Sequence, residues 1–540
     1  MTTNISKEKR DILVNKIKEI KQFIASSPQD ENTSTLLSYI ADIEKDIKGK
    51  KYGLVFEEHK EAIDEMLESH TPVLSEEKEL FIDNGGQMNF LLEGDNLASL
   101  QLLEKTHKGA IDFIYIDPPY NTGNKDFIYD DVFIDDIDTF KHSKWLSFMN
   151  SRLKIAKKLL KNNGSIFISI DDKEYANLKT LCDSIWDASN HVGTFIRKTV
   201  TQRAMAKFFN TQHEYCLVYC NDKKMFPLVG KEKDLSNYKN PDNDPNGDWK
   251  TSDPTMRGSK LFYKITNPYT NKEDLPPIGR GWAFSEEKLA ELIAIGKIVF
   301  KRSHNPNERG FIYKAYKKDL RSSNLLLNSL EFCDNNYLNQ TSSKEIIQIF
   351  DDNKFDYAKP SQFIKDLILQ SPQKDILILD FFAGSGTTGH AVMKLNAEDG
   401  GNRKFILCTN NENNICRDVT YERIKRVIEK EDYKASLKYM KVDFVPISDK
   451  LYYEYADELL KHIKELVELE NGINFDGNKE FSIILTEDEL DTYTNNITSE
   501  CKTIYLGHDV LPTEEQEDLF KKHKIKVNII PDYYYRGLEG

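Results

Sequence analysis

Long apolar runs are missing from this 540-residue sequence, and its first residues contain no apolar stretch typical of a signal peptide. Low-complexity segments are also missing, while charged residues make up 30% and apolar residues 39% of the chain. This composition disfavours a membrane-spanning protein and predicts a soluble, cytoplasmic one. At roughly 150 residues per domain, the length predicts three or four domains.

Cysteine is scarce, with seven residues scattered along the chain. Only Cys216 and Cys220 lie close together, in the segment HEYCLVYC, and no matching pair of Cys or His follows nearby. Structural zinc sites need four such ligands. We therefore expect neither a metal site nor structural disulfides.

Positive charge is in deficit, since 74 Lys and Arg stand against 88 Asp and Glu, a net charge of −14. Taken alone, that deficit disfavours a nucleic-acid partner. Its distribution changes the interpretation. Residues 441–540 carry 11 basic against 22 acidic residues and residues 1–80 carry 12 against 17, whereas residues 221–340 carry 20 against 16. The central region can therefore bind a polyanion.

The first part of the chain, residues 8–70, has helical periodicity. Two apolar stripes recur at helical spacing: Leu13, Ile17, Ile20 and Ile24, then Leu36, Ile40, Ile43 and Ile47. Two interpretations stay open, a helical cap over the next domain and an arm that binds a partner.

From about residue 85, short apolar strands alternate with amphipathic helices, which is typical of parallel strands joined by crossover helices. Over residues 221–340 the alternation gives way to segments rich in Asn, Pro, Gly, Lys and aromatics, and it resumes at DILILDFFAGSGTTGHAVMKL. Neither half has enough strands alone, so we predict one doubly wound α/β sheet interrupted by an insertion. From about residue 480 the pattern predicts a further small βαβαβ unit.

The segment DFFAGSGTTGHAV (380–392) follows an apolar strand and opens a helix. Gly384 and Gly386 permit a tight turn and close approach of a ligand, and the helix start offers free N–H groups. The segment fits neither the Walker A loop nor the G-x-G-x-x-G dinucleotide motif. Asp380, before the turn, suits an ammonium group, and Glu412 or a neighbouring Asn, after the next strand, is placed for ribose hydroxyls. An amino acid joined to a nucleoside describes S-adenosyl-L-methionine.

The segment IDFIYIDPPYNTG (111–123) ends a strand with an acid, two prolines and a tyrosine. Taken together, DPPY and DFFAGSG resemble the amino-methyltransferases that methylate exocyclic nitrogens in DNA. The resemblance implies that Asp117 and the Pro118 carbonyl accept the amino hydrogens of adenine and aim the N6 lone pair at the methyl group. It also implies that Pro119 helps to hold that carbonyl and that Tyr120 stacks on a base flipped out of the duplex.

The order of the motifs, catalytic first and cofactor last, resembles the permuted β group of these enzymes, which have a Rossmann-like methyltransferase sheet. The resemblance implies that Lys359 and Pro360, in the segment YAKPSQFIKDLI (357–368), close the methionine side of the cofactor pocket. Phe382 and Thr387 belong to the cofactor motif, and Asp95, at the end of a strand, is a further candidate for contact with the cofactor. The acid before Pro-Pro-Tyr favours adenine over cytosine.

Within the β group, the helical start and the phrases ILCTNNE and IIPDYYYRGLEG resemble Mod subunits of Type III restriction–modification systems. The resulting division is a helical arm (1–80), a catalytic half-domain (81–220), a target-recognition domain (221–340), a cofactor-binding half-domain (341–440) and a C-terminal α/β domain (441–540). The resemblance also implies double-stranded DNA as substrate, a homodimer held partly by the acidic ends, and an ATP-dependent helicase–nuclease subunit as partner. The alternatives are a solitary adenine methyltransferase and a DNA-binding protein that has lost turnover.

Two charged pairs receive structural interpretations. Asp171 and Asp172 follow a strand, where solvated or capping carboxylates are common. His213 and Glu214 are neighbours on a strand and point to opposite faces, so we do not expect them to share a catalytic site.

Overall fold

The computed structural model divides the chain into two compact units, one formed by Met1–Phe226, Phe332–Lys365 and Lys374–Gly540 and the other by Pro227–Glu331 and Asp366–Gln373. The residues it describes are 5–26, 33–48, 56–123, 128–129, 132–133, 138–201, 209–227, 229–320, 322–352, 354–447 and 452–535. No helix among them is long and apolar enough to cross a membrane.

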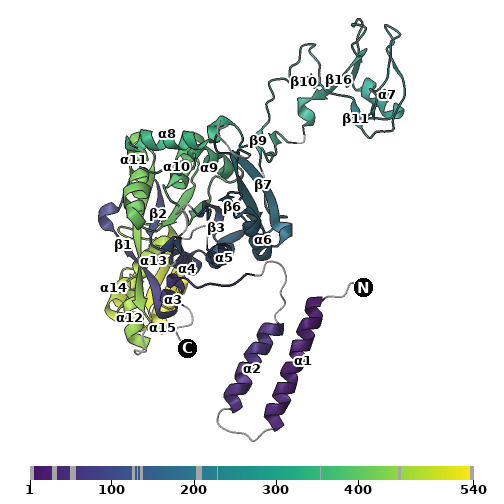
Figure 1. Ribbon diagram of the computed structural model, residues 1–540. Helices are drawn as coiled ribbons and strands as arrows, with labels where there is room; N and C mark the ends of the chain where they lie inside the picture. The colour runs from purple at the N-terminus through teal and green to yellow at the C-terminus, as the bar shows by residue number, and fades with distance from the viewer. Residues whose placement is uncertain are drawn as a thin grey trace. The chain divides into compact units, whose positions relative to one another are not determined.

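A nine-stranded sheet forms the centre of the first unit (Figure 1), with the strand order β1-β20-β2-β19-β18-β3-β6-β8-β7. Its strands are β1 (His70–Glu76), β2 (Gln87–Glu93), β3 (Ile111–Ile116), β6 (Leu160–Ile170), β7 (His191–Lys198), β8 (His213–Cys220), β18 (Leu377–Asp380), β19 (Lys404–Thr409) and β20 (Ala435–Pro446). β1 pairs antiparallel with β20, and β8 with β6 and β7; the other neighbours are parallel.

The prediction of one interrupted sheet is confirmed, because β18 pairs with β19 on one side and with β3 on the other. The chain continues from β3 to β6 on one side and from β18 to β19 on the other, which makes the boundary between β3 and β18 a topological switch point of the sheet. In open α/β sheets, ligands bind beyond the carboxyl ends of the strands at this point. Five of the six residues of β3 are buried, so both faces of this strand are covered, as expected for a central parallel strand.

Helices surround this sheet (Figure 1). They are α3 (Ala62–Ser69), α4 (Asn96–Thr106), α5 (Lys141–Leu159), α6 (Tyr175–Trp186), α8 (Asn339–Phe350), α9 (Ser361–Ile368), α10 (Thr387–Asp399), α11 (Glu422–Glu431), α12 (Tyr452–Leu460) and α13 (Ile463–Asn471). α5 contacts α4 and α6, while α11 contacts α8 and α10. A two-stranded ribbon of β4 (Ile128–Tyr129) and β5 (Val132–Phe133) follows β3 in the chain.

The predicted βαβαβ unit at the end of the chain is confirmed. β21 (Phe481–Ile484), α14 (Glu487–Asn495), β22 (Thr503–Gly507), α15 (Glu514–His523) and β23 (Lys526–Ile530) follow one another, and the three strands are parallel. Its own apolar core includes Ile504, Leu506 and Phe520.

The first two helices, α1 (Ile5–Ser26) and α2 (Thr33–Lys48), form a pair in which Lys21 bonds Glu44 at 2.6 Å. The predicted apolar stripes are buried only in part. Ile17 and Ile40 are buried, whereas the remaining predicted positions Leu13, Ile20, Leu36 and Ile43 are 46–52% exposed, and Ile24 is intermediate. Two paired helices cover one narrow row of each other, so the rest of each stripe stays uncovered. The side chain of Ile47 lies outside the described residues.

The described part of the second unit contains short strands and the helix α7, with a core of Ile265, Trp282, Phe284, Leu292, Ile298 and Phe311. The elements are β9 (Lys231–Glu232), β10 (Trp249–Thr251), β11 (Thr255–Arg257), β12 (Ile265–Thr266), β13 (Glu273–Asp274), β14 (Arg280–Trp282), α7 (Glu286–Ala294), β15 (Ile298–Phe300), β16 (Phe311–Tyr316) and β17 (Asn324–Leu325). Frequent Pro, Gly and Asn keep the strands short.

Candidate active site

The two predicted motifs meet at the switch point of the sheet. Asp117 follows β3 and Asp380 ends β18, and these strands pair in parallel, with Ile378 opposite Phe113. Both carboxylates therefore lie at the carboxyl edge of neighbouring strands, although 263 residues separate them in the sequence (380 minus 117).

The Asp117 carboxylate is bonded through both of its oxygens. Lys359 Nζ donates to Oδ2 at 2.5 Å, and the hydroxyl of Tyr120 donates to Oδ1 at 2.9 Å. Burial raises the pKa of Asp117; the charge of Lys359 opposes that rise, and the negative charge of Glu214 adds to it. The net result is a pKa above the usual range of an aspartate.

Glu214 and Arg197 complete this cluster, and the sequence interpretation missed both. Arg197 Nε donates to Glu214 Oε1 at 2.7 Å. The Tyr120 hydroxyl, whose single hydrogen is shared between Asp117 and Glu214, lies 3.2 Å from Glu214 Oε2. Burial raises the pKa of Glu214, but the charges of Arg197 and Lys359 outweigh burial and hold that pKa below its ordinary value. The missed signal was an acid inside an apolar strand together with an arginine in the preceding strand, which the register places opposite each other.

His213, Asp171 and Asp172 make local contacts outside the cluster, as predicted. Glu214 faces the cluster, while His213 Nε2 lies 3.1 Å from the hydroxyl of Tyr215. Asp172 accepts a hydrogen bond from Tyr215, and Asp171 accepts one from the backbone of Lys173.

The two prolines after Asp117 differ in how their carbonyls are used. The Pro119 carbonyl accepts a hydrogen bond from Trp145 Nε1 at 2.7 Å, which fixes the turn to α5. The Pro118 carbonyl accepts no hydrogen bond from the part of the chain that the structure describes. Asn121 then reverses the chain with a φ of 57° and donates to the buried Glu174 at 2.6 Å. The turn is therefore held from both sides, and one acceptor remains available.

Asp380 is a buried carboxylate without a cationic partner among the described residues. It is 2% exposed and accepts hydrogen bonds from Phe382 N at 3.0 Å and Thr388 Oγ1 at 2.5 Å. Burial raises its pKa to about 7. A ligand with an ammonium group would supply the missing positive charge.

The turn after Asp380 leads into α10 through two glycines in the left-handed region, Gly384 at φ 49° and Gly386 at φ 73°. A Cβ on Gly386 would lie 3.2 Å from Thr420 Cγ2. Thr387, the first residue of α10, is buried and accepts a hydrogen bond from Arg423 at 2.7 Å. The backbone conformation therefore requires glycine, and Arg423 fixes the helix start.

The remaining predicted residues surround the same edge of the sheet. Asp95 caps the start of α4 by accepting from Leu97 N at 2.7 Å, and its other oxygen is 3.5 Å from Arg152. Glu412 is exposed in a short turn after β19. The half-buried Phe382 ring lies 5.8 Å from the Phe148 ring. Pro360 is buried at the start of α9.

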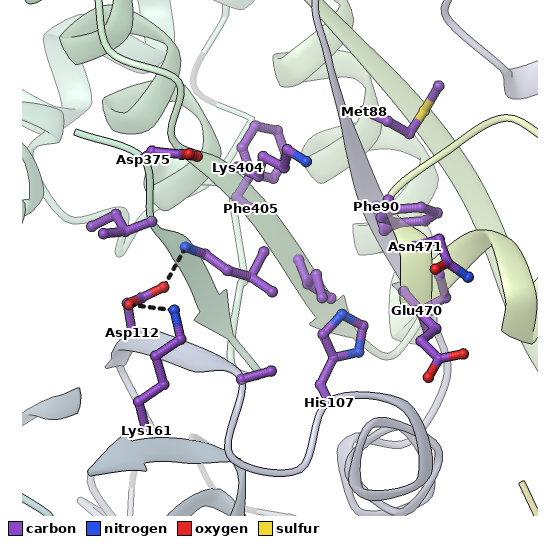
Figure 2. A pocket seen from close by; sticks show the side chains of 16 residues that line it. Met88, Phe90, His107, Asp112, Lys161, Asp375, Lys404, Phe405, Glu470 and Asn471 are labelled. Atoms are coloured by element: carbon purple, nitrogen blue, oxygen red, sulfur yellow. Dashed lines mark hydrogen bonds and ion pairs between the residues drawn. The ribbon is translucent and has the colours of Figure 1, made fainter. Parts of the chain in front are cut away.

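A cavity of about 280 Å³ lies at the opposite, amino-terminal edge of the sheet (Figure 2). His107 and Lys404 are among its lining residues. Its Asp112 is committed to the fold, because it accepts hydrogen bonds from Lys161 Nζ at 2.7 Å and from the backbone N of Leu377 at 3.0 Å. These bonds tie β3 to β6 and β18, and the cavity takes no part in the cluster around Asp117.

Comparison with known proteins gives a family match and several relatives. Residues 111–423 match the family described as DNA methylase (N6_N4_Mtase). The StyLTI Mod subunit of the Type III system from Salmonella typhimurium is 36% identical over 64% of this chain and 56% of its own length. The Type II methyltransferase M.KpnI from Klebsiella pneumoniae is 33% identical over 65% of this chain and 90% of its own length. The EcoP15I Mod subunit from Escherichia coli is 28% identical over 82% of this chain and 75% of its own length.

The first of these relatives is matched over only about half of its length. Among solved structures, the PvuII DNA methyltransferase (cytosine-N4-specific) aligns with a TM-score of 0.32 and 12% identity, over 66% of this chain and 97% of that one. The M1.HpyAVI–SAM complex aligns with a TM-score of 0.27 and 12% identity, over 62% and 98%.

Proposed function

Because the chain belongs to this family of DNA methylases, we propose that it methylates adenine N6 in double-stranded DNA with S-adenosyl-L-methionine as methyl donor. The observation that carries the proposal is the turn Asp117–Tyr120, which lies beside the turn after Asp380 at the switch point of the sheet. The acid at position 117 favours adenine over N4 of cytosine. The DNA substrate implies a cytoplasmic protein.

The cofactor supplies an electrophilic methyl group on a sulfonium. Asp380 would hold its ammonium group, since this buried carboxylate has no positive partner among the described residues. Gly384 and Gly386 keep the turn free of side chains, and Glu412 would bind the ribose. Asp95, Phe382 and Thr387 complete the predicted cofactor residues, while Lys359 and Pro360 precede α9.

Adenine N6 is a weak nucleophile because its lone pair is delocalised into the ring. The Asp117 carboxylate and the Pro118 carbonyl accept the two amino hydrogens and localise that lone pair. N6 would take the methyl group that the cofactor supplies, the electrons of the broken bond would stay with the departing thioether, and N6 would then release one proton. Asp117 is suited to receive that proton on its way to solvent, since its pKa is raised by burial.

The second unit, Pro227–Glu331 with Asp366–Gln373, falls largely within the interval 221–340 assigned to target recognition. Its excess of basic residues suits contact with phosphates. The exposed apolar rows of α1 and α2 suit contact between two copies of the chain, and the acidic C-terminal part suits protein partners. We therefore extend the proposal to a homodimeric Mod subunit with an ATP-dependent restriction partner.

A solitary methyltransferase is the second candidate. The match to M.KpnI, which is named a Type II methyltransferase and not a Mod subunit, covers 90% of that protein and keeps an enzyme without a Type III restriction subunit as a candidate. Recovery of an ATPase with the protein from its native host would support the Type III assignment, and recovery of the methyltransferase alone would support the solitary one.

The experiment that tests the activity is methyl transfer from labelled S-adenosyl-L-methionine to duplex DNA, followed by nucleoside mass spectrometry. N6-methyladenine is the expected product. N4-methylcytosine would contradict the base assignment, and no transfer by folded protein would leave a silent DNA-binding protein. Sequencing of host DNA for modified adenines identifies the recognised sequence.

A further inference from the structure

Both oxygens of Asp117 are already bonded within the protein. Oδ1 accepts from Tyr120 at 2.9 Å and Oδ2 accepts from Lys359 at 2.5 Å. An ionised carboxylate has about four acceptor sites, so an adenine amino group that donates to Asp117 either shares the carboxylate with these two donors or replaces one of them. This conclusion rests on the proposed function, because it takes adenine as the group that reaches Asp117.

Both donors have Glu214 as a second acceptor, since the Tyr120 hydroxyl lies 3.2 Å from Glu214 Oε2. Lys359 is the donor whose departure changes the charge beside Asp117. Its Nζ is 3.9 Å from Glu214 Oε1, so a small rotation of the side chain brings the ammonium within bonding distance. Lys359 is also near the face of Tyr120, with Nζ 5.0 Å from the ring centroid. The ammonium can therefore move between two carboxylates without leaving the cluster.

Glu214 is fixed firmly enough to act as that acceptor. Arg197 holds it through Nε at 2.7 Å, and Arg197 is itself held by the Tyr337 carbonyl at 2.5 Å and by Asn339 Oδ1 at 2.8 Å. Both charged side chains are almost fully buried, at 6% and 1% exposure. An acceptor anchored in this way stays in place while Lys359 moves.

We propose that Lys359 and Glu214 are positioning residues for catalysis: the Lys359 ammonium covers Asp117 until adenine enters, and then transfers to Glu214. The exchange frees Oδ2 of Asp117 for the amino group. Two carboxylates, one ammonium and one guanidinium are present before and after it, so the formal charge of the cluster is unchanged. Breaking a buried ion pair is costly. The exchange keeps the ammonium paired, now with Glu214, and leaves Asp117 facing N6, where positive charge develops as the nitrogen accepts the methyl group.

The charges around Asp117 predict opposite effects for the two variants. The titratable and charged groups near it in the described residues are Lys359 before α9, Glu214 and Cys216 on β8, Arg197 on β7, Tyr115 on β3, Asp380 on β18 and Tyr120 on its own turn. Removal of the positive charge of Lys359 leaves burial and Glu214 to raise the pKa of Asp117. Removal of the negative charge of Glu214 lowers that pKa.

The test is the pH dependence of single-turnover methyl transfer by the full-length protein, with DNA and S-adenosyl-L-methionine saturating. In Lys359→Met, we expect the acidic limb of the profile to shift to higher pH by about one unit or more, and the rate to recover at high pH. In Glu214→Gln, we expect the acidic limb to shift to lower pH. We also expect the plateau rate to fall about tenfold or more, because Lys359 has lost its alternative acceptor. Lys359→Arg, which keeps the charge, should restore the wild-type limb.

A matched control is Lys365→Met, which removes an equally buried lysine paired with Glu398 at 2.8 Å away from Asp117. It should leave the profile unchanged. Wild-type limbs in both Lys359→Met and Glu214→Gln, or shifts of the same sign, would overturn the exchange. If the wild-type protein transfers no methyl group to adenine, it is the proposed function that fails.

A crystal structure of the protein with sinefungin and its target duplex gives a second readout, which does not depend on how well the variants fold. The exchange predicts that Lys359 Nζ moves from 3.9 Å to within about 3.2 Å of a Glu214 oxygen. A Lys359 ammonium that stays on Asp117 beside a bound adenine would overturn the inference.

Discussion

Asp380 makes the affinity for the methyl donor depend on pH in a direction that can be measured. Burial raises its pKa to about 7, and no lysine or arginine among the described residues pairs with it. Below pH 7 the protonated carboxyl has to lose its proton before it can pair with an ammonium group. We therefore expect the affinity for S-adenosyl-L-methionine to rise about tenfold per pH unit up to pH 6 and to level off above pH 7.

The same carboxyl links stability to pH with the opposite sign. Its pKa in the folded protein, about 7, lies above the ordinary value of 3.8, so the folded state binds the proton more tightly than the unfolded state. The stabilisation is complete below pH 3.8 and is lost as the pH rises to 7, by an amount on the order of 4 kcal/mol. Saturating cofactor should weaken this loss, because its ammonium group stabilises the ionised form.

Calorimetric titration between pH 5 and 7.5 tests the affinity, with 5′-methylthioadenosine as the matched ligand because it lacks the ammonium group. Its affinity should not change with pH. In Asp380→Asn, binding of S-adenosyl-L-methionine should weaken and lose its pH dependence. Equal slopes for the two ligands, or an unchanged slope in Asp380→Asn, would refute the assignment of Asp380 to the ammonium group.

Four further predictions concern the remaining parts of the protein. Asp117→Ala should lower methyl transfer by about 100-fold or more while cofactor affinity by calorimetry stays normal; near-normal turnover would contradict the mechanism. Gly386→Val should abolish cofactor binding, since its φ of 73° disfavours valine and a Cβ would lie 3.2 Å from Thr420; unchanged affinity would place the cofactor elsewhere. Exchange of residues 227–331 with those of a relative should change the methylated sequence, read by sequencing, and a hybrid that keeps its original target would move recognition to another segment. Leu13→Ser with Ile20→Ser should shift light scattering from dimer to monomer; an active wild-type monomer at micromolar concentration would rule out the dimer.

The sheet could be predicted from the sequence because its evidence is local. Apolar strands alternate with amphipathic helices, and the two motifs carry turn residues that only the end of a strand accommodates. The position of Asp117 beside Asp380 then follows from the switch point of a doubly wound sheet. The left-handed backbone conformation of Gly386 could be predicted as well, because glycine is the residue that adopts it most readily.

The helical arm was predicted less completely, because periodicity identifies an apolar face and does not say what covers it. Ile17 and Ile40 are buried between the two helices, whereas Leu13 and Ile43 repeat at nearly the same spacing and remain exposed. How much of an apolar helical face is buried depends on the element that packs against it. The periodicity of one helix does not say how much of its face that element covers.

The cluster around Asp117 marks the limit of local reasoning. His213 and Glu214 were correctly assigned to opposite faces of a strand, but the face that Glu214 occupies becomes functional only through Arg197 on the next strand and Lys359 before α9. Those three residues lie up to 162 positions apart (359 minus 197), and no motif spacing connects them. All three are charged residues at buried positions, where apolar residues are usual. Since a buried charge is stable only when it is paired, each such residue implies a partner elsewhere in the chain, and a search for those partners would have found the cluster.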